Sequence, residues 1–257
     1  MIKKTSLYFP ENIRYRFFSR KNGVSEGDFA SLNCSVKVGD DPAKVRENMR
    51  RVAGNLGCTV EKLFVLHQTH SSIVIPVTTD DPFEKTPYGD ALVTNRPNIF
   101  LGIKTADCAP VLMADPEKEI IAAAHAGWRG AVGGILENTI KTMVEMGAET
   151  PNIIALIGPC IAPQSYEVDA EMKDEFLKED PKASLFFVPS DAGKYRFDLP
   201  GYVLAKLEHL GIGAAEWIGE DTYALEKEYF SHRRSSQKGK SSGRQISVIG
   251  MLDEALF

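Results

Sequence analysis

Two short apolar runs joined by a turn constrain the fold of this 257-residue chain more than any other feature. The runs, residues 110–114 and 120–124, flank the turn sequence Asp-Pro-Glu-Lys at 115–118. Apolar runs of this length around such a turn are typical of a β-hairpin. A hairpin brings the start of its first strand next to the end of its second. We therefore expect Cys108, just before the first run, to lie beside His125, just after the second.

A neighbouring thiol and imidazole support two kinds of chemistry. The imidazole can lower the pKa of the thiol and make it a nucleophile. The pair can also supply two ligands of a metal site, for which a third ligand is needed. His70, which lies between two predicted strands and precedes two small serines, is the candidate, and His67 is the alternative. Two imidazoles and a thiolate without an evident fourth ligand are typical of a catalytic zinc with an open position.

Composition narrows the class of protein. Hydrophobic residues make up 43% of the chain and charged residues 25%, which is typical of an ordinary globular protein with a substantial core. The formal net charge of −5 gives no bulk attraction to nucleic acid or to an anionic membrane. No segment resembles a signal peptide or a membrane span, so we expect a cytoplasmic protein. The four cysteines are scattered without a CxxC motif, which argues against a disulfide framework.

Hydrophobic periodicity and turn residues predict one α+β domain over residues 1–257, with mixed β-sheets flanked by helices. The expected helices are residues 42–56, 131–146, 168–178 and 199–210. The expected strands are residues 13–19, 63–66, 72–77, 90–94, 100–105, 110–114, 120–124, 153–157, 185–188, 215–218 and 245–251. Residues 23–41 and 231–243 are expected to form loops, of which the second is basic and flexible. We find no repeat or linker that would divide the chain.

Arginines are the candidates for an anion site in a chain that is acidic overall. Arg129 follows His125 by four residues, and Arg233, Arg234 and Arg244 lie near the C-terminus. A guanidinium group can hold phosphate or carboxylate through paired hydrogen bonds. We therefore expect these four arginines to bind substrate, although the segment around Arg233 is equally compatible with a solvated loop.

Two carboxylates, Asp90 and Asp107, are closest in sequence to the predicted site. Either could orient a histidine ligand, act as a general acid or base, or cap a turn. The predicted catalytic residues are Cys108, His125 and Asp107. The sequence alone does not decide between the roles of the two carboxylates.

Several sequence blocks resemble the YfiH/YlmD-like family, whose members carry the names multicopper polyphenol oxidase laccase and purine nucleoside phosphorylase. The blocks are HQTHSSIV (67–74), DALVT (90–94), KTADCAPVLMADP (104–116), AAAHAGWRGAVGGI (122–135), IGPCIAPQSYEV (157–168), and FSHRR with GRQ (230–234 and 243–245). The resemblance extends from residue 23 almost to the C-terminus. It implies a fold similar to the catalytic domain of cytotoxic necrotizing factor toxins.

The resemblance also implies a zinc ion held by His70, Cys108 and His125. It implies phosphorolysis of adenosine, inosine and methylthioadenosine, with adenosine deamination in addition, so purine nucleosides and phosphate are the expected partners. A zinc ion could activate water for attack on the purine while a carboxylate transfers protons. No protein partner is evident. Asp221 departs from the pattern, because many members carry a cysteine before the threonine that follows it, but it is not an expected metal ligand.

Other functions remain compatible with the sequence. A metal-free hydrolase or amidase would use Cys108 and His125, and editing of peptidoglycan precursors has been proposed within the family. Copper could replace zinc at such a site and give a polyphenol oxidase, but five histidines are too few for a multi-copper cluster. A purely structural zinc is disfavoured because structural sites usually have four ligands.

Overall fold

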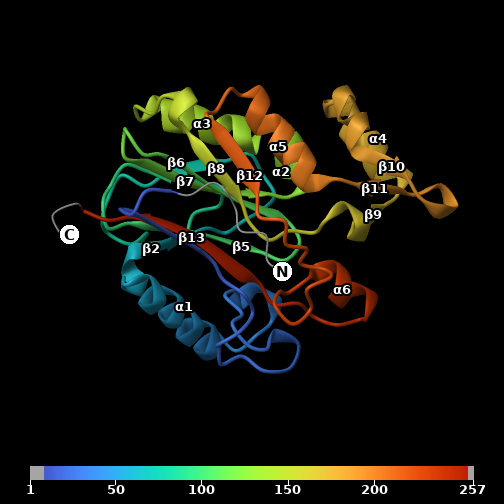
Figure 1. The fold of residues 1–257 in the computed structure, drawn as a ribbon. Helices are drawn as coiled ribbons and strands as arrows, with labels where there is room; N and C mark the ends of the chain where they lie inside the picture. Colours follow the sequence, from blue (N-terminus) through green and yellow to red (C-terminus); the bar gives the residue numbers. More distant parts are fainter. Residues whose placement is uncertain (1–8, 254–257) are drawn as a thin grey trace.

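The computed structural model describes residues 9–253, which form layers of sheet and helix (Figure 1). Two β-sheets pack face to face in the middle. Helix α1 (Pro42–Leu56) covers the outer face of the smaller of these sheets, and α3 (Ile135–Glu145) and α5 (Leu199–His209) cover the outer face of the larger. The α+β class with mixed sheets and flanking helices is therefore confirmed.

The larger sheet has six strands and contains the predicted hairpin. Its strands, in spatial order, are β12 (Ala214–Trp217), β8 (Ile154–Ile157), β6 (Ala109–Asp115), β7 (Ile120–Ala126), β4 (Ala91–Thr94) and β3 (Val74–Pro76). Every residue of β6 and β7 is buried, because the smaller sheet packs on one face and the helices pack on the other. This burial on both faces explains the continuous apolar runs in the sequence.

The smaller sheet has four strands, in the order β1 (Ile13–Phe17), β13 (Gln245–Met251), β5 (Phe100–Thr105) and β2 (Leu63–Val65). Strand β13 pairs with β5 in antiparallel register, so that Gln245 lies opposite Thr105. The core between the two sheets includes Leu101 from β5 and Leu112 from β6. This packing places the C-terminal end of β5 near the N-terminal end of β6, and the predicted site lies between these two ends.

A third sheet of short strands lies beside this core, in the order β10 (Phe187–Pro189), β11 (Tyr195–Phe197) and β9 (Glu167–Val168). Helix α4 (Ala170–Glu179) packs against it through Phe176, whose ring is 5.0 Å from that of Phe197. The sequence did not predict β9 or β11, because strands this short carry too few residues for a periodic pattern.

Two predicted segments differ from the structure in more than their end points. The single helix expected at 131–146 is two helices, α2 (Trp128–Val132) and α3, because Gly134 has a left-handed backbone with a φ of 92°. The loop expected at 231–243 contains α6 (His232–Gln237), which Ser231 caps by accepting a hydrogen bond from the backbone N–H of Arg234. None of the helices in residues 9–253 is both long and apolar enough to cross a membrane.

Candidate metal centre and its pocket

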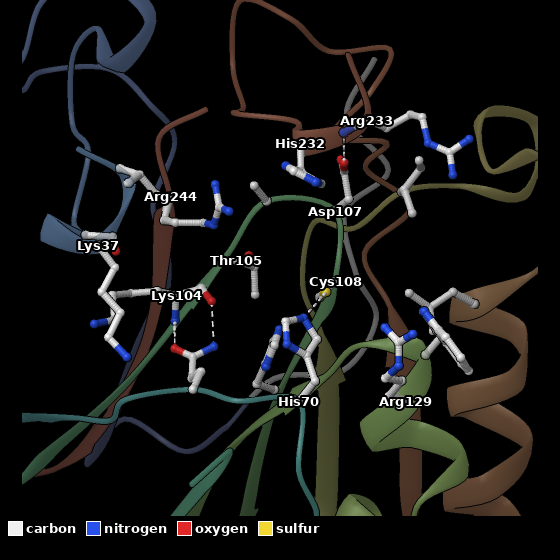
Figure 2. A pocket seen from close by; sticks show the side chains of 18 of the residues that line it. Lys37, His70, Lys104, Thr105, Asp107, Cys108, Arg129, His232, Arg233 and Arg244 are labelled. Atoms are coloured by element: carbon white, nitrogen blue, oxygen red, sulfur yellow. Dashed lines mark hydrogen bonds between the residues drawn. The ribbon is translucent and has the colours of Figure 1, made fainter. Parts of the chain in front are cut away.

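The hairpin places the thiol and the imidazole side by side, as the sequence predicts. Pro110 pairs with His125 across β6 and β7, and Cys108 directly precedes β6. His70 joins them from the loop between β2 and β3, so that the possible ligand atoms of the three residues lie within 4.8 Å of one another (Figure 2). The Sγ atom of Cys108 is 3.8 Å from Nε2 of His70. Ligands of a tetrahedral zinc ion are about 3.6 Å apart, so this donor set fits one metal ion.

Asp90 holds both histidines in place. Its carboxylate is fully buried and accepts a hydrogen bond of 2.8 Å from Nδ1 of His125. The same carboxylate accepts hydrogen bonds from the backbone N–H groups of Thr69, His70 and Ser71, and from the Ser71 hydroxyl. Of the roles considered for Asp90, the structure favours orientation of the histidine ligands, because every contact fixes a segment that carries one of them.

The loop of His70 and the turn before Cys108 both have an unusual backbone. His70 has a φ of 60° and Asp107 has a φ of 88°, which side chains with a Cβ rarely adopt. Each such residue costs of order 1–3 kcal/mol and persists only where its surroundings hold it. Here, Oδ1 of Asp90 accepts from the backbone N–H of His70, and the carbonyl of Asp107 accepts from the N–H of Ile161. The fold therefore maintains a strained backbone at two residues near the Cys108 thiol, one in the loop of His70 and one in the turn before Cys108.

Gly127 leaves the space in which the three side chains meet. A Cβ atom at this position would lie 2.9 Å from Sγ of Cys108 and 2.9 Å from Cδ2 of His70. Real Cβ contacts are essentially never this short. The glycine after His125 is therefore required by the site itself and not by a turn, since its φ of −72° is available to any residue.

The electrostatics of the site favour a thiolate beside a charged imidazole. Burial raises the pKa of the Cys108 thiol, but His125 and His70 outweigh this effect and lower that pKa to about 6. Burial lowers the pKa of His125, but Cys108 and Asp90 outweigh it and raise that pKa to about 9. Burial raises the pKa of Asp90, yet hydrogen bonds from His125 and Ser71 hold it well below its usual range. A thiolate is the form of cysteine that binds metal and attacks carbon.

Asp107 is buried, and both of its carboxylate oxygens already have partners. Oδ1 accepts a hydrogen bond of 2.7 Å from the Thr222 hydroxyl, and Oδ2 accepts one of 2.7 Å from the backbone N–H of Arg233. The second bond joins the turn before Cys108 to α6, which carries Arg233, and the first joins it to the loop that contains Thr222. The structure therefore favours a positioning role for Asp107 over the acid–base role expected from the sequence.

A pocket of about 550 Å³ opens above the three candidate ligands. This is the size of a site for a small organic molecule. Its lining includes five basic side chains and one acidic side chain, namely Lys37, Lys104, Arg129, Arg233 and Arg244 with Asp107. A chain with a net charge of −5 has thus gathered positive charge around one cavity.

Three of the four predicted substrate arginines line this pocket. Arg129 is exposed and stacks on Trp128, with its guanidinium carbon 4.3 Å from the ring centre. Arg233 lies over Tyr166 at 5.4 Å and donates to the carbonyl of Glu167. Arg244 is the third predicted arginine that lines the pocket.

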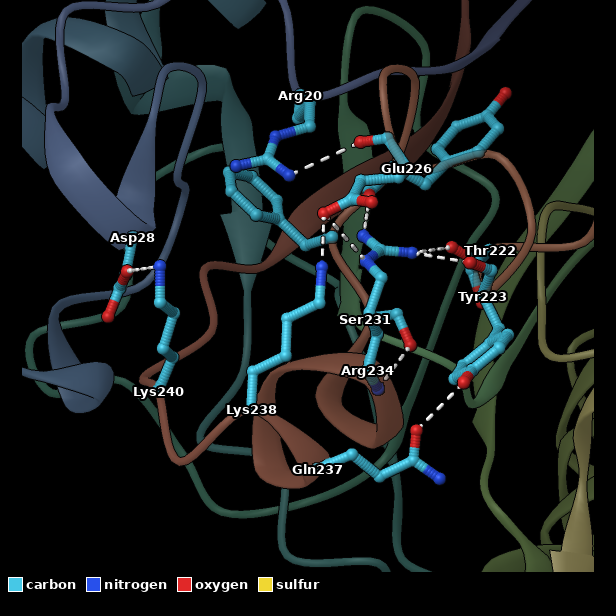
Figure 3. A network of polar contacts seen from close by, with 12 residues as sticks. Arg20, Asp28, Thr222, Tyr223, Glu226, Ser231, Arg234, Gln237, Lys238 and Lys240 are labelled. Carbon is cyan, nitrogen blue, oxygen red and sulfur yellow. Dashed lines mark hydrogen bonds and ion pairs between the residues drawn. The ribbon is translucent and has the colours of Figure 1, made fainter.

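Arg234 is not among the pocket residues. It is buried, and its guanidinium donates hydrogen bonds to the backbone carbonyls of Thr222, Tyr223 and Tyr229 (Figure 3). Glu226 lies 3.6 Å from its Nε atom. Arg234 therefore anchors α6, and we leave it out of the proposed substrate site. Its neighbour Arg233 faces the pocket because successive residues of a helix point in different directions.

Sequence reasoning missed several pocket residues, among them two lysines and two aromatic residues. Lys37, Lys104, Trp128 and Tyr166 all line the cavity. A signal existed for Lys104, because it interrupts an otherwise apolar strand at the edge of the predicted site. His67, the alternative ligand, does not belong to the group of possible metal ligands and instead packs against Tyr88, with ring centres 5.3 Å apart.

Asp221, where many relatives of the resembled family carry cysteine, has a structural role in this chain. It is buried, and its carboxylate accepts hydrogen bonds from the backbone N–H groups of Ala162 and Tyr223 and from the Ser165 hydroxyl. These contacts fix the segment that leads to Tyr166 in the pocket. Asp221 itself does not line the pocket.

Fold and site together define an α+β protein in which three possible metal ligands lie at the base of a cationic pocket. The sequence also matches a family model described as multi-copper polyphenol oxidoreductase laccase over residues 14–252. The chain belongs to this family, which includes the YfiH-type proteins named purine nucleoside phosphorylase. The resemblance found in the sequence blocks is therefore confirmed.

Relatives from distant bacteria cover almost the whole chain. A purine nucleoside phosphorylase of Deinococcus radiodurans is 37% identical over 239 residues, covering 93% of this chain and 89% of the relative. The purine nucleoside phosphorylase YfiH of Escherichia coli is 36% identical and covers 95% of this chain and 96% of the relative.

Solved structures have the same fold. A Neisseria meningitidis protein is 33% identical and superposes with a TM-score of 0.86, covering 95% of this chain and 96% of its own. YfiH of Bacillus licheniformis is 32% identical and gives a TM-score of 0.87, with 93% of each chain covered. The likeness thus extends over the sheets, the helices and the loops that carry the site.

Proposed function

We propose that the protein is a metal-dependent enzyme that cleaves adenosine, inosine and methylthioadenosine with phosphate, and that it also deaminates adenosine. The observation that carries this proposal is the position of His70, Cys108 and His125 at the base of a cationic pocket of about 550 Å³. Relatives that are 36–37% identical and are named purine nucleoside phosphorylase support the reaction class.

The proposed cofactor is zinc, held by His70, Cys108 and His125. One thiolate and two imidazoles suit zinc, and copper is the alternative at the same residues. Residues 9–253 gather one group of this kind, which supports a single ion and not a cluster of several coppers. When bound, zinc supplies a Lewis acid that polarises an oxygen or activates a water molecule.

Phosphorolysis breaks the bond between C1′ of the sugar and the purine nitrogen, and forms a bond between C1′ and a phosphate oxygen. The base leaves with the electron pair of the broken bond and gains a proton, while positive charge develops on the sugar. In this proposal Arg129, Arg233 and Arg244, which all line the pocket, bind the reactants, and the positive charge of the pocket suits the anionic phosphate. Trp128 and Tyr166 supply aromatic faces for the purine, and Asp107 fixes the turn before Cys108.

Deamination exchanges the amino group at C6 of adenosine for an oxygen from water and releases ammonia. The reaction needs water and a group that transfers protons to the departing nitrogen. His232 lines the pocket, and burial, together with the neighbouring Arg244, lowers its pKa. We propose that His232 accepts a proton from the attacking water and passes it to the departing nitrogen, because its lowered pKa favours the neutral imidazole.

The decisive experiment incubates zinc-loaded protein with adenosine in the presence and absence of phosphate. With phosphate, we expect adenine, ribose 1-phosphate and some inosine. Without phosphate, release of adenine should stop while formation of inosine continues. Base release that persists without phosphate would instead identify a nucleoside hydrolase. If none of the three nucleosides reacts under either condition, the nucleoside proposal is wrong.

A metal-free cysteine hydrolase or amidase is the second candidate, and the low pKa of Cys108, about 6, favours it. Metal analysis separates the two candidates. The zinc enzyme should contain one zinc ion per chain, and the Cys108→Ala variant should contain almost none. Equal zinc in both proteins would favour the hydrolase, for which glutamine side chains and peptidoglycan precursors are the substrates to test.

A further inference from the structure

The pocket has two chemically different sides, with Cys108 between them (Figure 2). Lys37, Lys104 and Arg244 lie on one side. Arg129 and Arg233 lie on the other, next to the rings of Trp128 and Tyr166. The first side presents three cations, whereas the second combines two arginines with aromatic rings. This asymmetry suggests that the two sides bind different parts of the reactants.

The cations of the first side form no ion pair among residues 9–253, although Asp107 acts on Arg244 from a greater distance. Lys37, Lys104 and Arg244 take part in none of the ion pairs, although Lys37 lies over the ring of Tyr88 at 5.5 Å. Burial lowers the pKa of Lys104, and the nearby Lys37 lowers it further. Burial also lowers the pKa of Arg244. At Lys104 and Arg244, positive charge that is partly desolvated and outside any ion pair is stabilised by an anion.

Thr105 supplies an independent observation on the same side. Its hydroxyl oxygen is buried and has no hydrogen-bond partner in the structure, and the residue lines the pocket. Its exposed fraction is 1%. A buried hydroxyl without a protein partner is costly, so the Thr105 hydroxyl is free to donate a hydrogen bond to a ligand in the pocket. In Figure 2 Thr105 lies between Lys104 and Cys108.

Segments far apart in the sequence are fixed together to form this side. The amide of Gln68 donates to the carbonyl of Lys104 at 2.7 Å and accepts from its backbone N–H at 2.9 Å. The side chain of Asn33 accepts from the backbone N–H of Arg244 at 2.9 Å, and Cys34 donates from its N–H to the Arg244 carbonyl. The backbones that carry Lys104 and Arg244 are thus held in place before any ligand binds.

We propose that Lys37, Lys104, Arg244 and the Thr105 hydroxyl form the subsite for inorganic phosphate, and that the purine binds on the opposite side against Trp128. This assignment rests on the proposed function. In a displacement at C1′ the phosphate and the departing base lie on opposite faces of that carbon, and the two sides of the pocket lie on opposite sides of Cys108. Three donors of positive charge and one hydroxyl match the oxygens of a phosphate dianion.

The test measures binding of inorganic phosphate to the zinc-loaded protein by calorimetry, without nucleoside. Lys104→Met keeps the length of the side chain and removes its charge, and Lys37→Met makes the same change at an exposed residue where folding is not at risk. Each variant should bind phosphate about tenfold more weakly or worse, because a hydrogen bond to a charged group is lost. The matched control is Lys240→Met. Lys240 is exposed, lies 3.9 Å from Asp28 and is outside the pocket, so this variant should bind phosphate as the wild type does.

Enzyme kinetics provide the second readout. In Lys37→Met and Lys104→Met the KM for phosphate should rise about tenfold, while the KM for adenosine changes less than about twofold. Wild-type affinity for phosphate in both variants would overturn the subsite even if the enzyme cleaves adenosine. Weakened phosphate binding in a protein that never cleaves adenosine would instead keep the subsite and reject the proposed function.

The same cations could bind the phosphate of a nucleotide, and one further measurement separates the two sources. Adenosine 5′-monophosphate is titrated into the wild type and into Lys104→Met. We expect inorganic phosphate to lose affinity in the variant, and the nucleotide to lose less. If the nucleotide loses about tenfold or more while inorganic phosphate is unaffected, these residues form a nucleotide site and the proposal is wrong.

Discussion

Nδ1 of His125 donates a hydrogen bond of 2.8 Å to Oδ1 of Asp90, and this contact decides which ring nitrogen faces the thiol. An ionised carboxylate only accepts hydrogen bonds, so the proton must reside on Nδ1. Nε2 is then left toward Cys108 and His70. Because the same carboxylate also binds the backbone of residues 69–71, one buried side chain orients both histidines.

The first prediction therefore concerns Asp90→Asn. An amide can replace one acceptor but cannot accept from all the N–H groups that converge on the carboxylate. We expect zinc affinity to fall about 10–100-fold and the free energy of unfolding to fall by roughly 3 kcal/mol. Zinc titration against a competing chelator and urea unfolding measure the two quantities. The exposed Asp81 gives the control, since Asp81→Asn should change neither.

The difference in the free energy of unfolding between the wild type and Asp90→Asn should depend on pH in a defined direction. The pKa of Asp90 is depressed in the folded protein, whereas an unfolded aspartate has a pKa of about 3.9. The contribution of the carboxylate is then fully present above about pH 4 and is lost as the pH falls through the folded pKa. Wild type and Asp90→Asn should converge in strongly acidic urea titrations, and a gap that widens on acidification would contradict this account.

The second prediction concerns the reactivity of Cys108 in metal-free protein. Its thiol has a pKa of about 6, so its alkylation by iodoacetamide should increase with pH around a midpoint near 6. Cys58, with a pKa of about 11, serves as an internal comparison and should react only in alkaline solution. Mass spectrometry of tryptic peptides measures both sites, and added zinc should protect Cys108. A midpoint near 8.5 would mean that the histidines do not act on this thiol.

The third prediction uses two glycines whose backbone conformations are both open to alanine but whose surroundings differ. Gly127→Ala introduces a methyl group 2.9 Å from Sγ of Cys108, so we expect zinc affinity to fall about tenfold or more through overpacking. Gly54→Ala introduces the same group into α1, where nothing lies within 4 Å, and should stabilise the protein by about 0.5–1 kcal/mol. Unchanged zinc binding in Gly127→Ala would show that the three ligands do not meet at this point.

The parts of the site that the sequence predicted are those carried by local patterns. The turn at 115–118 and the two apolar runs determine the register of a hairpin, and that register alone places Cys108 beside His125. The phosphate side of the pocket depends instead on contacts such as that of Asn33 with Arg244, which are 211 residues apart. A contact between residues so far apart leaves no periodic pattern in the local sequence.

Helix α6 shows a second limit of local reasoning. Arg233 and Arg234 are adjacent and chemically identical, and both were expected to bind substrate. Their difference arises from Ser231, whose hydroxyl caps the helix and so fixes the direction in which each arginine points. The glycines at 133 and 134 gave a comparable signal for the break between α2 and α3, but the apolar period of the segment concealed it.

The fourth prediction is that Arg129→Lys remains folded and loses activity. Arg129 is exposed and makes its described contact with the ring of Trp128, so its free energy of unfolding should change by less than about 0.5 kcal/mol. A lysine keeps the charge but cannot reproduce the planar guanidinium that stacks on an aromatic ring and donates paired hydrogen bonds. We expect kcat/KM for adenosine to fall at least about tenfold at saturating phosphate. An unfolded variant, or one with wild-type kinetics, would contradict the placement of Arg129 in the substrate site.

The last prediction treats the same substitution at Arg234 as a test of structure. The Arg234 guanidinium donates to three backbone carbonyls at 2.6–2.7 Å, and a lysine ammonium cannot reach all three. Leaving buried acceptors unpaired should lower the free energy of unfolding by about 2–4 kcal/mol, measured as a lower urea midpoint with an unchanged m-value. Arg50→Lys, at an exposed residue of α1, should leave the midpoint unchanged. If Arg234→Lys is as stable as the wild type but no longer binds substrate, then Arg234 belongs to the substrate site after all, and the anchoring role assigned to it is wrong.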